Sequence, residues 1–110
     1  MIDWARVADL RHEIGDDGFA EVVDLFLDEV EEVVARLEIR PDPARLEEDL
    51  HFLKGSAWNL GFADFGARCH EAERSARPDL RAALESYRRS REAFLDGLGA
   101  LTRTGTPNAA

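Results

Sequence analysis

Apolar residues recur along most of the chain at the spacing of one face of a helix. The clearest stretch lies within residues 17–38, where intervals of four and three residues alternate, a spacing typical of the buried face of a bundle helix. Its apolar residues are Phe19, Val23, Phe26, Val30, Val33 and Leu37. A convincing alternation of apolar and polar residues, the pattern of a half-buried strand, is missing. The sequence therefore predicts an all-α protein.

Glycine, proline and aspartate mark where these helices begin and end. Asp3, Asp42 and Asp79 stand where N-caps are needed. Glycines within residues 15–18 separate the first two helices, and Gly61 ends the third. The expected helices span about residues 3–13, 17–38, 43–60, 63–77 and 80–101.

Short connections between long amphipathic helices favour neighbours that run in opposite directions. We therefore predict an antiparallel up-down four-helix bundle, with the short additional N-terminal helix packed across one end. The bundle is expected to form one domain over residues 1–101. The last helix is expected to fray at Gly97 and Gly99, and residues 102–110 are expected to form a disordered tail.

Size and charge exclude several classes of function. A chain of 110 residues forms a single core and cannot hold a nucleotide-binding domain beside a second domain. We therefore expect no enzyme with its own ATP site. Fourteen basic and 23 acidic residues give a net charge of −9, which opposes binding to nucleic acid or anionic lipid. No signal peptide and no apolar run of transmembrane length are recognisable, so a cytoplasmic protein is expected.

Cys69, His70 and Glu73 come closest to a metal-binding set in this sequence. A metal centre in a helical bundle needs Glu-x-x-His pairs that face inward, whereas the buried faces predicted here are apolar. We therefore expect no metal and no cofactor. Cys69 has no second cysteine to pair with and is expected to be a small buried apolar side chain.

His51 is expected on the exposed flank of its helix. At about 100° per residue it lies roughly 130° from the buried direction defined by residues such as Leu50 and Leu53. Lys54 and Gly55 share this flank, so the ammonium group can reach an anion on His51 and the glycine leaves space around the ring. A histidine on a helix flank is usually an ordinary surface residue, but these neighbours suit an imidazole that carries a phosphoryl group.

The run HFLKGSA at residues 51–57, with the Leu-Gly pair that follows at 60–61, resembles the signature of the histidine-containing phosphotransfer (HPt) domain. The resemblance extends over most of the chain and leaves out only the C-terminal tail. It implies a four-helix bundle that shuttles phosphoryl groups between aspartates of receiver domains. His51 would then be the phosphorylated residue, Lys54 would pair with phosphoryl oxygens, and Gly55 would keep access open.

Two residues near the motif depart from the usual pattern of this family. Leu50 stands where members often have a small residue, and Glu73 stands where they often have a glutamine that points at the ring. A carboxylate that accepts from Nδ1–H of His51 would leave Nε2 as the nucleophile; alternatively, Glu73 is solvated. Ser56 also has two interpretations, a hydrogen bond to a carbonyl one turn back, which we favour, or a place near the phosphate.

Apolar residues near His51 are candidates for docking a partner. They are Phe52, Trp58, Val22, Leu25 and Leu10. The resemblance implies response-regulator receiver domains as partners, with a hybrid histidine kinase as a further candidate, and Mg²⁺ is expected on the receiver. Since no second long apolar face is present, we expect a monomer.

Two functions are compatible with these residues. The first is a phosphocarrier that accepts a phosphoryl group on His51 from a receiver aspartate and passes it to another receiver. The second is a non-transferring helical interaction module that binds receivers or kinases as an inhibitor or scaffold. A module of the second kind would be expected to lack the histidine, so the presence of His51 favours the first.

Overall fold

The described part of the protein is helical, which confirms the all-α prediction. The computed structural model describes residues 1–105, with side chains for residues 1–99. Within this range there is no β-strand, and none of the helices has an apolar stretch long enough to cross a bilayer. In chain order the helices are α1 (Trp4–Ile39), α2 (Leu46–Leu60), α3 (Ala63–Arg74) and α4 (Leu80–Gly105).

A bend at Gly15 divides α1 into a short arm (residues 4–14) and a long arm (residues 16–39). Gly15 has φ 79° and ψ 162°, and a positive φ of this kind favours glycine. The two arms correspond to the first two predicted helices, but the break is confined to Gly15 instead of extending over residues 15–18.

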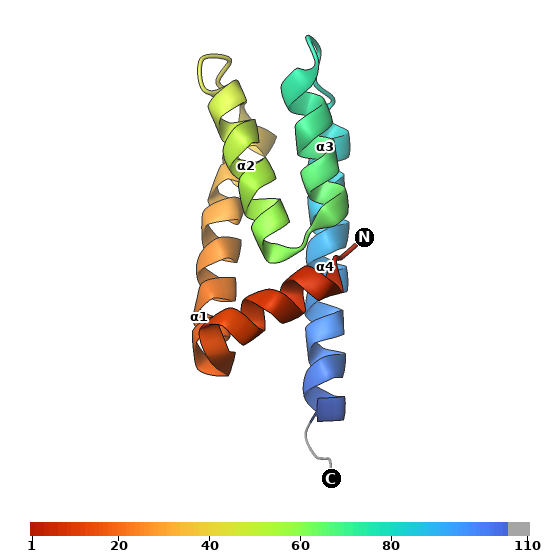
Figure 1. Ribbon diagram of the computed structural model, residues 1–110. Coiled ribbons are helices and arrows are strands. Elements are labelled where there is room, and N and C mark those ends of the chain that lie inside the picture. The colour runs from red at the N-terminus through yellow and green to blue at the C-terminus, as the bar shows by residue number, and fades with distance from the viewer. Residues whose placement is uncertain (106–110) are drawn as a thin grey trace.

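The long arm, α2, α3 and α4 run in alternating directions along the molecule (Figure 1). α2 packs most extensively on α3, and among the helix pairs that are in contact α1 and α4 share the smallest interface. The short arm turns back from the bend and crosses the molecule to reach α4 (Figure 1). At this crossing Trp4 stacks on Phe94 of α4, with ring centroids 6.0 Å apart. The short arm is therefore a part of α1 that folds back to pack on α4.

Apolar residues from all the helices form one core. The residues predicted for the buried face of the long arm are buried except Phe26, which is only partly buried, and Leu27 joins the core beside them. On the short arm Leu10 is 8% exposed. Leu10 therefore offers little surface to a partner, because the bend at Gly15 folds this face of the short arm onto the core. Cys69 is fully buried as expected, and burial raises its pKa to about 12.

The predicted helix starts agree only in part with the structure. Asp3 and Asp79 accept hydrogen bonds from the main-chain N–H three residues later, with Oδ1–N distances of 3.2 and 3.0 Å, so both N-caps are confirmed. Asp42 instead accepts from the N–H two residues later, at 3.0 Å, within a turn. As a result α2 begins at Leu46 and not at residue 43.

The ends of α3 and α4 also differ from the prediction. α3 ends at Arg74 and not at residue 77. α4 passes through Gly97 and Gly99 and reaches Gly105, so the expected fraying at these glycines is wrong. The predicted tail thus begins inside α4, and residues 106–110 lie outside the described part of the chain.

The turn between α2 and α3 is held by the N-terminal segment. Gly61 ends α2 as predicted, in the left-handed conformation with φ 87°. A Cβ on Gly61 would lie 2.8 Å from the carbonyl oxygen of Asp3 and 2.9 Å from Cγ2 of Val7. The N–H of Asp3 in turn donates to the carbonyl of Gly61, at 2.7 Å. Both the conformation and the close approach require glycine at this position.

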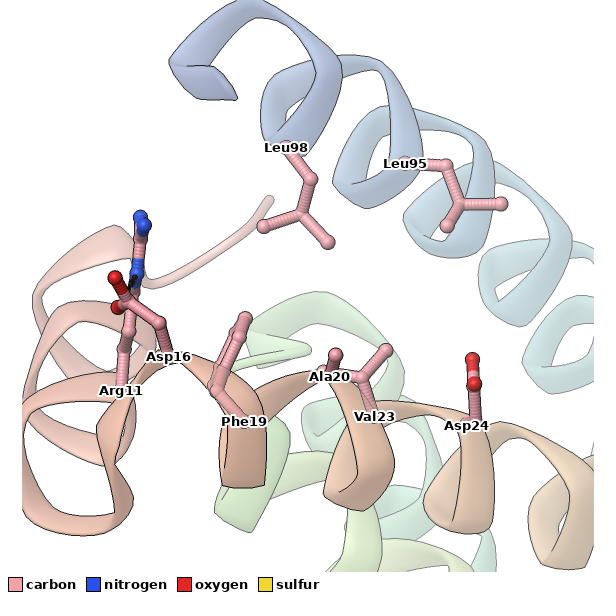
Figure 2. Close-up of a pocket in the computed structure, with 8 residues that line it drawn as sticks. All are labelled: Arg11, Asp16, Phe19, Ala20, Val23, Asp24, Leu95 and Leu98. Carbon is pink, nitrogen blue, oxygen red and sulfur yellow. Dashed lines mark hydrogen bonds and ion pairs between the residues drawn. The ribbon is translucent and has the colours of Figure 1, made fainter. Parts of the chain in front are cut away.

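Polar side chains join the long arm of α1 to α4 in one region, and a groove lies between them in another. Oε2 of Glu31 accepts hydrogen bonds from Tyr87 Oη (3.0 Å) and Arg91 Nε (2.6 Å) on α4. Nearer the bend, a groove of about 330 Å³ opens between the long arm and α4 (Figure 2). The apolar side chains that line it include Phe19, Val23, Leu95 and Leu98. The long arm and α4 are therefore joined by a few specific contacts and not by a continuous apolar interface.

Candidate functional site

His51 lies on the solvent-facing flank of α2, as predicted. Its side chain is 73% exposed, whereas Leu50 and Leu53 on the buried face are 2% and 1% exposed. The preceding turn of α2 is held to the long arm by Arg36, which donates to both carboxylate oxygens of buried Asp49 at 3.1 and 3.2 Å. The imidazole is therefore presented to solvent by a helix that is fixed on its other side.

Glu73 of α3 contacts the ring of His51, which excludes the alternative of a solvated carboxylate. Oε1 of Glu73 lies 2.9 Å from Nδ1 of His51, and Oε2 accepts a hydrogen bond from Nζ of Lys54 at 2.5 Å. The side chain of Glu73 is only 16% exposed. The hydrogen bond from Lys54, and next the one with His51, lower the pKa of Glu73 below its ordinary value.

The ionised carboxylate determines which ring nitrogen is free. Because a carboxylate only accepts hydrogen bonds, Nδ1 of His51 must carry the proton in this contact. In the neutral ring Nε2 then keeps its lone pair. Glu73 therefore orients the imidazole and leaves Nε2 as the nucleophilic atom.

Lys54 is held inside the site instead of extending into solvent. Its side chain is 16% exposed, and besides the Glu73 carboxylate its Nζ faces the ring of Trp58, 5.8 Å from the centroid. The sequence led us to expect Lys54 beside the phosphoryl oxygens. The structure adds that a fixed acidic partner already places the ammonium group next to the imidazole.

Gly55 faces open space. A Cβ built on this residue would meet no atom within 4 Å outside the local helix. Packing within the chain therefore does not explain a glycine here, although glycine costs about 1 kcal/mol relative to alanine inside a helix. The space it leaves is on the surface beside the imidazole, where only an incoming group or partner could use it.

The geometry of an exposed, carboxylate-oriented histidine agrees with the comparison to known families. The model of the Hpt domain matches residues 21–103, which include all of α2 and α3. The chain belongs to the Hpt domain family. No curated protein and no solved structure matches the chain. Hpt domains are phosphocarrier modules that transfer phosphoryl groups through a histidine in phosphorelays and interact with receiver domains.

Other predicted site residues of this Hpt domain divide by their exposure. Ser56 is 7% exposed and lies on the buried side of α2, away from the solvent-facing flank that carries His51. Phe52 and Leu25 are 37% and 58% exposed and stay candidates for docking, while Val22 packs partly against the core. In residues 1–105, no group of three or more His, Cys, Asp or Glu side chains is placed to hold a metal ion.

Trp58 has a neighbour that the sequence analysis missed. Its indole lies so close to α3 that a Cβ on Gly66 would be 2.2 Å from Nε1 of Trp58. The ring of His70 lies beside it, with centroids 6.0 Å apart. A glycine in the middle of a predicted helix indicates that another group packs closely on it. The sequence alone could not identify that group as Trp58, because the contact depends on how α2 packs on α3.

Proposed function

We propose that this Hpt domain is a phosphocarrier of a multistep phosphorelay. Its His51 accepts a phosphoryl group from the aspartyl phosphate of one receiver domain and passes it to an aspartate of another. The contact between Nδ1 of His51 and Glu73 carries the proposal, because it leaves Nε2 exposed with its lone pair. The alternating helix directions of Figure 1 support the antiparallel four-helix bundle as its architecture.

In the transfer step the Nε2 lone pair forms a bond to phosphorus while the bond from phosphorus to the aspartate oxygen breaks. The aspartate leaves as a carboxylate with the electron pair of that bond. The proton on Nδ1 stays in place, so the phosphorylated ring carries positive charge, which the carboxylate of Glu73 stabilises. The same charge makes the ring a good leaving group when the phosphoryl group moves on. No general base is needed in either direction.

Electrostatic balance at the site depends on Lys54. Phosphoryl transfer passes through a loose transition state with negative charge on the three equatorial oxygens. Glu73 alone would repel that charge, but its ion pair with Lys54 places a cation at the same point. The ammonium group can share its hydrogens between the carboxylate and the phosphoryl oxygens. We assign the Mg²⁺ and the acceptor aspartate to the receiver.

Phosphoryl labelling tests the proposal directly. The chain is incubated with a phosphorylated receiver and Mg²⁺, and wild-type protein and His51→Gln are compared. Acid-labile label is expected on the wild type and is expected to be missing from the variant. Equal labelling of both would show that His51 is not the phosphorylated residue. Receiver binding without labelling of the wild type would instead identify the non-transferring interaction module.

A further inference from the structure

Trp58 is fixed in place by α3 and not by its own helix. Its indole rests on the main chain at Gly66, where a Cβ would lie 2.2 Å from Nε1 and 2.3 Å from Cδ1. The ring of His70, one turn later on α3, lies with its centroid 6.0 Å from that of the indole, and the two rings are tilted by 43°. Any side chain larger than hydrogen at residue 66 would force the indole to move.

The same ring restrains Lys54. Lys54 lies one turn before Trp58 on α2, and its Nζ is within cation–π distance of the indole, 5.8 Å from the centroid. Glu73 binds the ammonium group through Oε2. A lysine side chain normally has large rotamer freedom in solution, yet this one is held by a ring and a carboxylate and is only 16% exposed.

We propose that Trp58 is a positioning residue for phosphoryl transfer: seated on Gly66, its indole holds the Lys54 ammonium group at Glu73, beside the reacting imidazole. The inference rests on the proposed function, since it assigns Lys54 to the phosphoryl oxygens. It replaces the expectation from the sequence that Trp58 docks the partner. Trp58 acts through Lys54 and does not touch the phosphoryl group.

Transfer kinetics separate positioning from docking. Trp58→Leu and Trp58→Phe are compared with wild type in single-turnover transfer from a phosphorylated receiver at increasing receiver concentration. Loss of the ring lets Lys54 leave the site, so Trp58→Leu is expected to lower the maximal rate about threefold to tenfold. The half-saturating receiver concentration is expected to stay within about twofold. Trp58→Phe keeps an aromatic face and is expected to recover most of the rate.

Gly66→Ala perturbs the same contact from α3. It is expected to slow transfer in the wild-type background and to have no further effect in the Trp58→Leu background, where no indole is present to be displaced. Gly97→Ala is the matched control, because it displaces Trp4 from an equivalent contact, with a Cβ 2.2 Å from Cζ2 of that indole. Trp4 packs on Phe94 instead of the site, so this variant is expected to lose stability and keep its transfer rate.

Nuclear magnetic resonance gives a readout that does not depend on phosphoryl transfer. Lys54 is the only lysine in the sequence, so ¹⁵N-lysine labelling yields a single side-chain ammonium signal. Hydrogen exchange of this signal is expected to be faster in Trp58→Leu than in wild type, and the pKa of Glu73 is expected to return toward its ordinary value.

Two results would overturn the inference. One is a higher half-saturating concentration with an unchanged maximal rate in Trp58→Leu, which would make Trp58 a docking residue. The other is an ammonium signal that is unaffected by loss of the ring. If the wild type is not labelled on His51 at all, the proposed function fails instead, and the ammonium signal still reports whether Trp58 holds Lys54.

Discussion

The crossing of the short arm over α4 and the exposed flank of α2 each place a tryptophan on a helical glycine, but the two rings have different neighbours. At the crossing Trp4 lies on Gly97 and stacks on Phe94 at 6.0 Å, and Phe94 is fully buried. On the flank Trp58 lies on Gly66, is 47% exposed and faces an ammonium group. Trp4 itself is 36% exposed, so the same packing arrangement covers a buried ring in one region and restrains a charge in the other.

The difference separates stability from chemistry in this Hpt domain. Apolar rings in a closed core contribute mainly to the free energy of unfolding. The Lys54–Glu73 ion pair beside the exposed imidazole is 16% exposed on both sides. We expect it to contribute less to that free energy than a buried ring does, but to decide how an incoming phosphoryl group is received. Substitutions at the crossing should therefore change stability and leave transfer intact, whereas substitutions on the flank should do the reverse.

Phe94→Ala is expected to have the largest effect on stability. The substitution removes a fully buried ring that stacks on Trp4 and meets Phe62 edge-on at 5.1 Å. Such truncations cost about 3–5 kcal/mol of the free energy of unfolding, which chemical denaturation measures. The folded fraction is expected to be phosphorylated at the wild-type rate. A slower rate per folded molecule would contradict the separation of the two regions.

Lys54→Ala is expected to have the largest effect on transfer. Loss of a positioned cation at developing phosphoryl charge is expected to slow transfer by about 100-fold, measured at saturating receiver. Receiver affinity and the denaturation midpoint are expected to change little. Arg68→Ala is the matched control, because Arg68 is an exposed cation of α3 whose ion pair with Glu71 is long, at 3.7 Å. Equal losses of affinity and rate in Lys54→Ala would make Lys54 a docking residue.

The contrast between these regions also shows what the sequence could predict. Helix positions, the buried faces and the exposure of His51 follow from periodicity, because they depend on the geometry of one helix at a time. The capping of α1 by Asp3 and of α4 by Asp79 is equally local. These features were predicted correctly, with errors of a few residues at the start of α2 and at the ends of α3 and α4.

Features that depend on how two helices meet were not predictable in the same way. Whether Glu73 touches the ring of His51 depends on the placement of α3 against α2, and the sequence left both alternatives open. Leu10 was named as a docking candidate, and its burial could not be predicted because periodicity does not show that a positive φ at Gly15 turns the short arm back onto the core. Trp58 was named as a docking candidate because it is an apolar residue near His51. Its contact with α3 could not be predicted, since that contact joins residues from separate helices.

Glu73→Gln tests the charge of the flank through its dependence on pH. The pKa of Glu73 is lower in the folded protein than its ordinary value of 4.5, so the ionised carboxylate stabilises the fold above that value. This contribution is lost as the pH falls through the folded pKa. Glutamine keeps an acceptor for Nδ1–H but lacks the charge that binds Lys54. Wild type is therefore expected to be slightly more stable than the variant at pH 7.

Denaturation measured between about pH 7 and pH 3 checks this expectation. The difference in stability between wild type and Glu73→Gln is expected to shrink toward the acidic end, as the pH falls toward the lowered pKa of Glu73. Glu71→Gln is the control on the same helix, because that residue contacts neither the histidine nor the lysine of the site. If the difference were constant across the range, the ionised carboxylate of Glu73 would not be the source of the stabilisation.

Gly55→Ala is expected to change stability by a small amount and with the opposite sign to Phe94→Ala. A methyl group at residue 55 meets no atom within 4 Å, so the variant is expected to gain up to about 1 kcal/mol from helix propensity. The same methyl group enters the space beside His51, so transfer is expected to slow. Gly18→Ala, whose Cβ would meet only Cβ of Ile14 at 3.7 Å, is the control and should gain stability without slowing transfer. A Gly55→Ala protein that is both more stable and equally fast would show that the open space on this flank is not used by the incoming group.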